Sequence, residues 1–289
     1  SHAACDAHRD NGPANAATAG LDQGVPGNTA ASHAERVAKG NAAAIDANPF
    51  GMFFGAASTL KLRPDLRVPV LTVITESDLT GFAPLKGFSE TRQPDYEKLR
   101  VWEITGTAHA DNYVFSVGFI DSPSLPIEQL AAAYAPMTKS FGGTPEKPLN
   151  FGPQHHYVTQ AALWQLDRWL KTGEAPPKAP EIKITQDKPA KLVTDAHGIA
   201  QGGIRTPWVD VPTAVLTGDG GMAGSGKPFD AAKLQQLYPG GKPDYLKKFE
   251  VSLDSAIKNG FIVPEDKSEI MGLASHGFAN QQAAAKAKE

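Results

Sequence analysis

A carboxylate and a histidine each follow an apolar run of this chain, and together they have the chemistry of an acid–base pair. The first run, VPVLTVITESD, ends in Glu76 and Asp78, and the second, LRVWEITGTAHAD, contains His109. Both runs are rich in β-branched residues without polar alternation, which is typical of buried parallel strands. Such strands end at one edge of a sheet, so the sequence predicts an acid and a base in one crevice.

Asp78 is the favoured acid of this pair. A carboxylate before a histidine in the chain would fix the tautomer of the imidazole and stabilise the imidazolium that forms during proton transfer. Asp78 occupies the aspartate position of the common pattern in which an apolar strand is followed by Gly-x-x-Asp, and Glu76 is the alternative acid two residues earlier. The competing interpretation is structural: Asp78 caps a loop and His109 is a polar residue at a strand end.

Three elements must position these residues. The pattern predicts strands over Val68–Thr75 and Leu99–Thr105, which are parallel because the connection between them is long enough for a crossover. That connection, Leu79–Lys98, is broken by Gly and Pro and leaves little room for a regular helix. Apolar residues at helical spacing predict a helix over Tyr157–Lys171 that ends at Thr172-Gly173.

The remainder of the chain reads as short elements after an extended linker, APPKAP, at 175–180. We predict strands at EIKIT, KLV and WVDVPTAVLT. Three short helices follow: one capped by Asp230, one over about Lys242–Asn259, and one that opens with Pro264-Glu265.

Composition excludes several classes of function. The net charge of −3 arises from 28 basic and 31 acidic residues that are well mixed, so no basic surface for nucleic acid is expected. No apolar run reaches the ~18 residues of a membrane span, and no basic segment followed by an apolar stretch marks a signal peptide. Cys5 is the only cysteine, so no internal disulfide forms.

Several motifs, in order, resemble the C-terminal half of the bacterial alpha/beta-hydrolase domain-containing family, which is poorly characterised and esterase-like. The resemblance runs from about residue 62 to 275. The motifs are VPVLTVITESD (68–78), RQPD (92–95), LRVWEITGTAHAD (99–111), GPQHHYV (152–158), ALWQLDRWLKTGEAPP (162–177), GGIRTPWVDVP (202–212) and PFDAAKLQQLYP (228–239).

The resemblance implies an α/β fold with a doubly wound, mostly parallel sheet, followed by a C-terminal extension of short strands and helices. It divides the chain into a surface or lid segment (1–61), the C-terminal half of the hydrolase core (62–174) and a family-specific extension (175–289). It also implies a serine hydrolase of carboxylic esters or related acyl compounds, with Asp78 and His109 as acid and base, and it favours a secreted or periplasmic location.

The nucleophile of such an enzyme is missing from the pattern. No G-x-S-x-G elbow precedes the acid strand, and with it the oxyanion hole is absent. We therefore expect the N-terminal half of the fold, with nucleophile and oxyanion hole, on a second polypeptide or outside this chain. The alternatives are a non-catalytic binding or interaction module that retains the half-fold, and an N-terminal-nucleophile hydrolase that uses Ser1, which the Ala/Asn/Gly-rich opening does not favour.

Other candidate residues are weaker. Gln154, His155 and His156 stand just before the predicted helix, where one histidine would lie beside the substrate or orient groups near His109 while the other packs or is solvated. GMAGSGKP (221–228) resembles a phosphate loop, but Pro stands where Ser or Thr would hold magnesium, so we predict a Gly-rich surface loop. We expect no cofactor and no metal, because the cluster His2, Cys5, Asp6 and His8 lies at a terminus without a supporting core.

Overall fold

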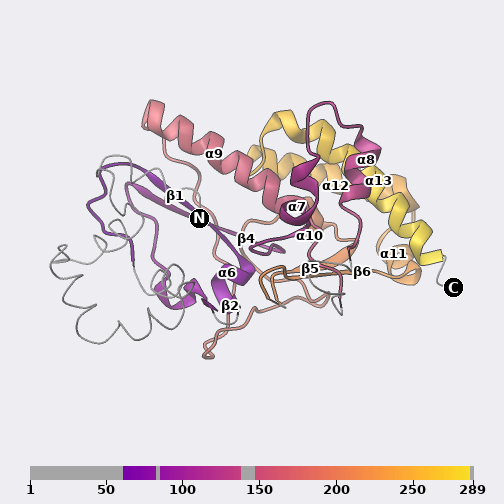
Figure 1. The fold of residues 1–289 in the computed structure, drawn as a ribbon, viewed down its shortest axis with the longest axis horizontal. Helices are drawn as coiled ribbons and strands as arrows, with labels where there is room; N and C mark the ends of the chain where they lie inside the picture. The colour runs from indigo at the N-terminus through magenta and orange to yellow at the C-terminus, as the bar shows by residue number, and fades with distance from the viewer. Residues whose placement is uncertain (1–60, 83–84, 138–146, 220, 287–289) are drawn as a thin grey trace.

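A computed structural model describes residues 61–82, 85–137, 147–219 and 221–286 of the protein (Figure 1). Its central feature is a pair of parallel strands, β1 (Val70–Thr75) and β4 (Leu99–Ile104). Val70 lies opposite Leu99 and Thr75 opposite Ile104, so both strands end at the same edge. The two parallel strands expected from the sequence are therefore confirmed.

The connection between these strands is irregular, as its Gly and Pro residues predicted. A short helix comes directly after β1. Two strands of two residues each and a 3₁₀ turn complete the connection. The elements are α6 (Glu76–Thr80), β2 (Gly81–Phe82), β3 (Leu85–Lys86) and η3 (Phe88–Thr91).

The sheet continues on the far side of β4 through one bridge. Ile204 pairs in parallel with Ile104, and the backbone amide of Thr105 donates to the Ile204 carbonyl at 3.1 Å. The strands predicted at EIKIT and KLV form only isolated bridges, at Ile182, Ile184, Leu192 and Thr194. The sheet of the described residues thus has two regular strands and an irregular margin.

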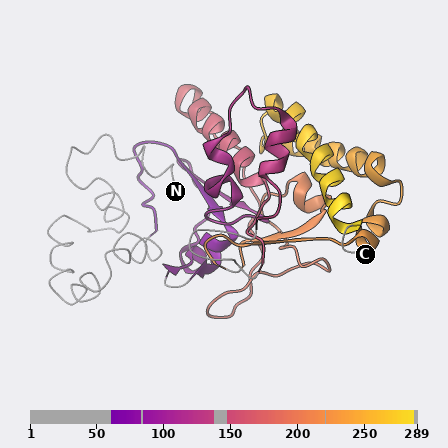
Figure 2. The ribbon, with the colours of Figure 1, turned by 45° about the vertical axis from the view of Figure 1, so that its right-hand side comes forward.

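One face of this sheet is covered by α9 (Gln154–Thr172), as Figures 1 and 2 both show. The helix predicted over 157–171 is confirmed and begins three residues earlier. It ends at Gly173, whose φ of +77° is a left-handed conformation that glycine adopts without strain. The buried residues between helix and sheet are apolar: Leu71, Trp102, Ile104, Val158, Ala161, Ala162, Leu166 and Trp169.

The prediction of one strand over WVDVPTAVLT is wrong. Residues Pro207–Asp210 form a short helix, α10, because proline suits the first turn of a helix. Only Ala214–Thr217 is a strand, β5. It pairs antiparallel with β6 (Ser225–Pro228) in a hairpin.

The prediction of a surface loop over the Gly-rich stretch 221–228 is confirmed for 221–224 and wrong for its second half, which is β6. Gly226 allows this strand to approach the core: a Cβ added there would lie 2.4 Å from the Phe151 ring. Tertiary packing against that ring thus overrides the poor strand propensity of Ser-Gly-Lys-Pro.

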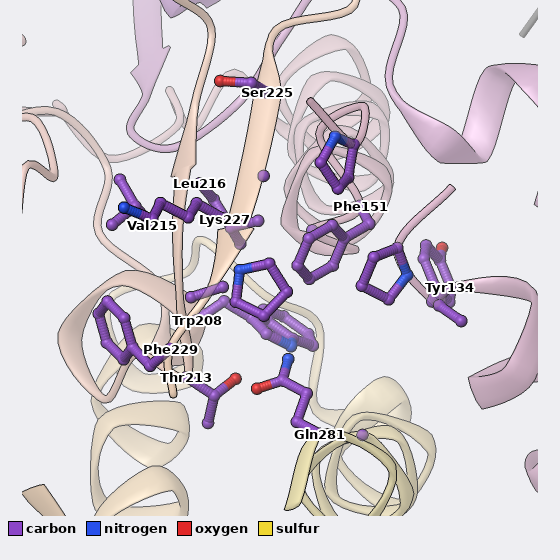
Figure 3. A pocket seen from close by; sticks show the side chains of 18 of the residues that line it. Tyr134, Phe151, Trp208, Thr213, Val215, Leu216, Ser225, Lys227, Phe229 and Gln281 are labelled. Atoms are coloured by element: carbon purple, nitrogen blue, oxygen red, sulfur yellow. The ribbon is translucent and has the colours of Figure 1, made fainter. Parts of the chain in front are cut away.

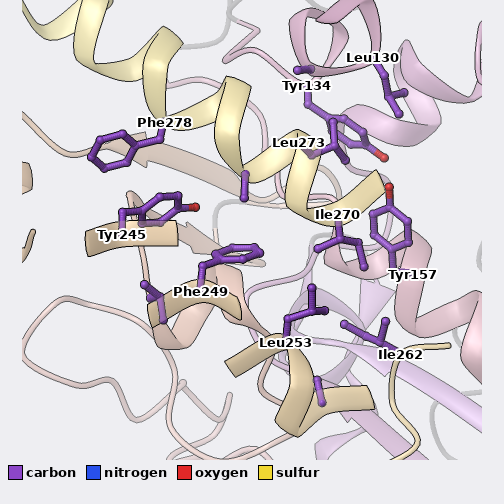
Figure 4. Close-up of a cluster of buried hydrophobic side chains, with 14 of the residues drawn as sticks. Leu130, Tyr134, Tyr157, Tyr245, Phe249, Leu253, Ile262, Ile270, Leu273 and Phe278 are labelled. Atoms are coloured by element: carbon purple, nitrogen blue, oxygen red, sulfur yellow. The ribbon is translucent and has the colours of Figure 1, made fainter. Parts of the chain in front are cut away.

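A second core lies among helices at the other end of the molecule (Figure 4). The three helices predicted there are confirmed, but two are long rather than short. The helices of this region are α7 (Asn112–Phe115), η4 (Val117–Phe119), α8 (Ile127–Ala133), α11 (Ala231–Leu237), α12 (Gly241–Lys258), η5 (Pro264–Asp266) and α13 (Lys267–Lys286).

This helical core joins segments that are far apart in the chain. Tyr157 of α9 packs in it with Phe249 of α12 and Ile270 of α13. The division at residues 174 and 175 stays a prediction, although this core draws on both sides of it. In the part of the chain that the structure describes, no helix combines the length and apolar character needed to cross a bilayer.

Candidate active site

Asp78 and His109 lie in direct contact at the shared edge of β1 and β4. The Asp78 Oδ1 atom is 2.7 Å from Nδ1 of His109. Each residue lies a few positions after the end of its strand. Because the two parallel strands end at the same edge, this arrangement brings Asp78 and His109 together. The acid and the base that the sequence singled out are thus adjacent in space.

Thr75 fixes the orientation of the Asp78 carboxylate. It is the N-cap residue of α6, and its backbone amide and hydroxyl donate to Asp78 Oδ2 at 3.1 and 2.8 Å. Burial disfavours the charged form of Asp78, but the bonds from His109 and Thr75 outweigh it and hold the pKa of Asp78 below its ordinary value. The hydrogen bond to Asp78 in turn raises the pKa of His109.

The loop that carries His109 is held at several points. Gly106, with φ of +76°, begins the turn, and its carbonyl accepts bonds from Gln154 Nε2 at 2.6 Å and Asn150 Nδ2 at 2.9 Å. The backbone amide of His109 donates to the Ser77 hydroxyl at 2.8 Å. The imidazole is therefore presented by a loop whose backbone is fixed before and at the histidine.

Glu76 has a different environment from Asp78. Its fully buried carboxylate accepts bonds from the amides of Gly106 (2.6 Å) and Gly218 (2.7 Å) and from the Thr217 hydroxyl (2.9 Å). Burial raises the pKa of Glu76 to about 7, against the effect of these donors. No hydrogen bond or ion pair joins Glu76 to His109 among the described residues, so the geometry places Glu76 as a link between three chain segments.

The two histidines at the start of α9 diverge. His155 Nδ1 lies 3.4 Å from the buried carboxylate of Asp111, whose Oδ2 has no hydrogen-bond partner among the described residues. His156 instead stacks on Tyr113, with ring centroids 4.1 Å apart, and burial lowers the pKa of His156. Thus His155 approaches the loop of His109, through Asp111, and His156 packs against an aromatic ring.

Sequence reasoning missed Thr75, Asn150 and Asp111, which hold the site from behind. For Thr75 a signal exists: residues 75–78 read Thr-x-x-Asp, the pattern of a capping box. For Asn150 and Asp111 the partners lie tens of residues away along the chain, at Gly106 and His155, and no local pattern marks them.

No hydroxyl group among the described residues bonds to the side chain of His109. Ser77, whose hydroxyl does contact this loop, accepts the backbone amide of His109 instead. The serines 1, 32 and 58 and the cluster His2, Cys5, Asp6 and His8 lie outside the described residues. Within those residues no three His, Cys, Asp or Glu side chains are grouped as metal ligands.

A large cavity lies beside this site, but neither Asp78 nor His109 lines it (Figure 3). It has a volume of about 1600 Å³ and is formed by the β5–β6 hairpin, α8 and α13. A wall between the two regions is formed by residues 217–219 and 221–225, named here the 217–225 wall: Gly224 lines the cavity, and a Cβ added to it would lie 2.7 Å from Ala108. The loop of His109 and the cavity thus share one wall.

Comparison with known proteins gives one family. A family model described as an alpha/beta hydrolase domain matches residues 11–272 of the chain. No curated protein and no solved structure shows significant similarity to the sequence.

Proposed function

Because the chain belongs to the alpha/beta hydrolase domain family, we propose that Asp78 and His109 are the acid and base of a serine hydrolase that acts on carboxylic esters or related acyl compounds. The observation that carries this proposal is the 2.7 Å bond between Asp78 Oδ1 and His109 Nδ1. An aspartate that only capped a loop would not need both this bond to His109 and the orientation of its carboxylate by Thr75.

In this proposal each ring nitrogen has its own role. Asp78 accepts a hydrogen bond from Nδ1–H of His109, which leaves Nε2 as the basic nitrogen. Nε2 takes the proton of the attacking hydroxyl, and Asp78 stabilises the imidazolium that results. The imidazolium then returns the proton to the leaving alcohol, and the cycle repeats with water to release the acid.

The nucleophile and the oxyanion hole come, in this proposal, from a separate polypeptide or from an N-terminal part outside the described residues. Two facts support it. Among the described strands, β1 pairs only with β4, so one edge of β1 is available for a further strand. A doubly wound sheet needs more than two parallel strands to cover its apolar faces.

The alternative is a non-catalytic binding module that keeps this half of the fold. The large cavity behind the 217–225 wall favours it, because a ligand site there needs no nucleophile. The two functions differ in one observable: only the hydrolase reacts with an active-site-directed fluorophosphonate.

The test is to treat native material with a fluorophosphonate probe and to measure intact masses after denaturation. We expect a labelled serine outside residues 61–286. His109→Ala should lower the labelling rate by about 10²–10⁴-fold, since it removes the general base.

The matched control is His276→Ala, which removes an exposed histidine of α13 and should leave labelling unchanged. Labelling of wild-type and His109→Ala protein at equal rates contradicts the catalytic role. Absence of labelling in all native preparations favours the binding module.

A further inference from the structure

We propose that the cavity between the β5–β6 hairpin and α13 is a binding site for a large, neutral, mostly apolar molecule that carries one hydroxyl group. Its volume of about 1600 Å³ exceeds the range of roughly 300–1000 Å³ that is common for small-molecule pockets. This site is separate from the Asp78–His109 pair and does not depend on hydrolytic activity.

The walls of the cavity are aromatic. Aromatic rings face it, among them the labelled rings of Tyr134, Phe151, Trp208 and Phe229 in Figure 3, and they supply broad apolar surfaces of fixed shape. Trp208 is held rigidly, because its indole stacks on Tyr157 with the ring planes 6° apart and meets Phe249 edge-on. The aromatic side chains are those of Tyr134, Phe151, Trp208, Phe229, Tyr245 and Phe278.

One end of the cavity is polar. Figure 3 shows the Gln281 amide of α13 and the Thr213 hydroxyl at the same end, below the Trp208 indole. Neither side chain has a hydrogen-bond partner among the described residues, and Oε1 of Gln281 is buried without one. Because the buried Gln281 Oε1 atom is a hydrogen-bond acceptor, it is positioned to bind a ligand group that donates, such as a hydroxyl.

The charged residues that line the cavity give it little net charge, so they do not favour a charged ligand. Two lysines, Lys147 and Lys227, and two aspartates, Asp219 and Asp230, lie around the cavity, so their charges nearly cancel. Asp230 is also committed to the N-terminus of α11, where its carboxylate accepts the Lys233 amide at 2.7 Å. His197 adds an aromatic ring near Phe229. The expected ligand is therefore neutral.

Gly277 offers a way to fill the cavity without disturbing the fold. It lines the cavity from α13, and a Cβ added there has no heavy atom within 4 Å. Gly277→Phe thus places a ring in open space, and Gly277→Ala is a matched control with the same backbone change but no bulk. Both replacements raise helix propensity.

The experiment uses the full chain and two probes that differ by one oxygen, 1-pyrenebutanol and 1-butylpyrene. Binding is followed by energy transfer from tryptophan to pyrene. We expect Gly277→Phe to weaken binding of 1-pyrenebutanol at least ~10-fold and Gly277→Ala by less than ~2-fold. Trp208→Phe should remove most of the energy transfer, although Trp102, Trp164 and Trp169 remain.

A second variant tests the polar end. Gln281→Leu should abolish the preference for the alcohol over the hydrocarbon, which we expect to be ~2- to 10-fold in the wild type. Equal binding to wild type and Gly277→Phe, or an alcohol preference that survives Gln281→Leu, overturns the proposal. Because neither measurement requires catalysis, the proposal stands or falls independently of fluorophosphonate labelling.

Discussion

The strand-end region around Asp78 and His109 and the cavity region around Trp208 are built in opposite ways. In the first, polar groups are paired closely: Asp78 alone accepts three bonds, from His109 and from two atoms of Thr75. In the second, aromatic rings surround an open space, and the polar groups of Gln281 and Thr213 have no partner among the described residues. Pre-paired groups suit proton transfer, and unpaired ones suit a ligand.

The largest expected effect separates the two regions through Asp78. Asp78→Asn keeps the shape of the side chain but loses the charge that fixes the His109 tautomer, so fluorophosphonate labelling should fall about 10³–10⁴-fold. Binding of 1-pyrenebutanol should not change, because Asp78 does not line the cavity. Asp167→Asn, at an exposed ion pair of α9, serves as the control. Loss of both activities would mean that the regions are not independent.

The next effect comes from the cavity side. Phe151→Ala removes a buried ring that packs against Ala214 and Leu216, and it should lower the free energy of unfolding by about 3 kcal/mol. In folded protein the rate of labelling should stay within a few-fold of wild type. Chemical denaturation measures the first quantity. Phe119→Ala, at a phenylalanine that is 79% exposed, should cost far less stability.

A smaller effect tests how Asp78 is held. Thr75→Val removes the hydroxyl that caps α6 and bonds to Asp78 Oδ2 but keeps the β-branched shape. We expect a loss of about 1 kcal/mol in stability and a fall of roughly tenfold in labelling, since the carboxylate is less well oriented. Thr172→Val, at the exposed end of α9, is the control, because its hydroxyl also accepts and donates near a helix end. A Thr75→Val protein that labels at the wild-type rate would show that Asp78 needs no such support.

The two regions also differ in how far the sequence foretold them. The apolar runs before Asp78 and His109 are local signals, and parallel pairing alone brings their ends together, so this part was predicted. The cavity is formed by residues from Ala131 to Gln281 that meet only through tertiary packing. No local pattern encodes such a space. One of its walls, β6, was assigned as a loop because packing overrides the poor strand propensity of its residues. Another, α10, was assigned as part of a strand although Pro207 suits the first turn of a helix.

A similar limit explains why the sequence did not reveal the contacts of Glu76, beside Asp78 and His109. Glu76 was considered as the alternative acid because it follows a predicted strand, and the structure does place it directly after β1. Its partners Thr217 and Gly218 follow more than 140 residues later, and a distance of that kind along the chain hides a contact from any sequence pattern. A charged residue at the end of a predicted strand therefore allows its position in the fold to be predicted more reliably than its role.

The smallest effect concerns pH, and it involves the ionisable groups of the strand-end region. His109 has a raised pKa in the folded protein, so the stability that it contributes is fully present below its unfolded pKa of about 6.5 and is lost as pH rises through the folded value. Asp78 has a lowered pKa, so its contribution is present above about pH 3.8 and is lost as pH falls through the folded value. The pKa of Glu76 is about 7 in the folded protein, above its ordinary value of 4.5. Its contribution to the free energy of unfolding is therefore present at low pH and is lost as pH rises from about 4.5 to 7.

These signs predict that His109→Gln flattens the decline in stability above pH 6.5. The loss of stability below pH 3.8 should become smaller in this variant but should not disappear, because Thr75 still donates to Asp78. Phe151→Ala should lower the whole curve without changing its slope, since the Phe151 side chain carries no proton. Denaturant titrations across pH 3–9 measure both. Because the His109 ring is about one-third exposed, solvent screens its ion pair and the change is the smallest of the series. A Phe151→Ala curve that changes slope above pH 6.5 would instead mean that packing around the cavity transmits to the histidine through the shared 217–225 wall.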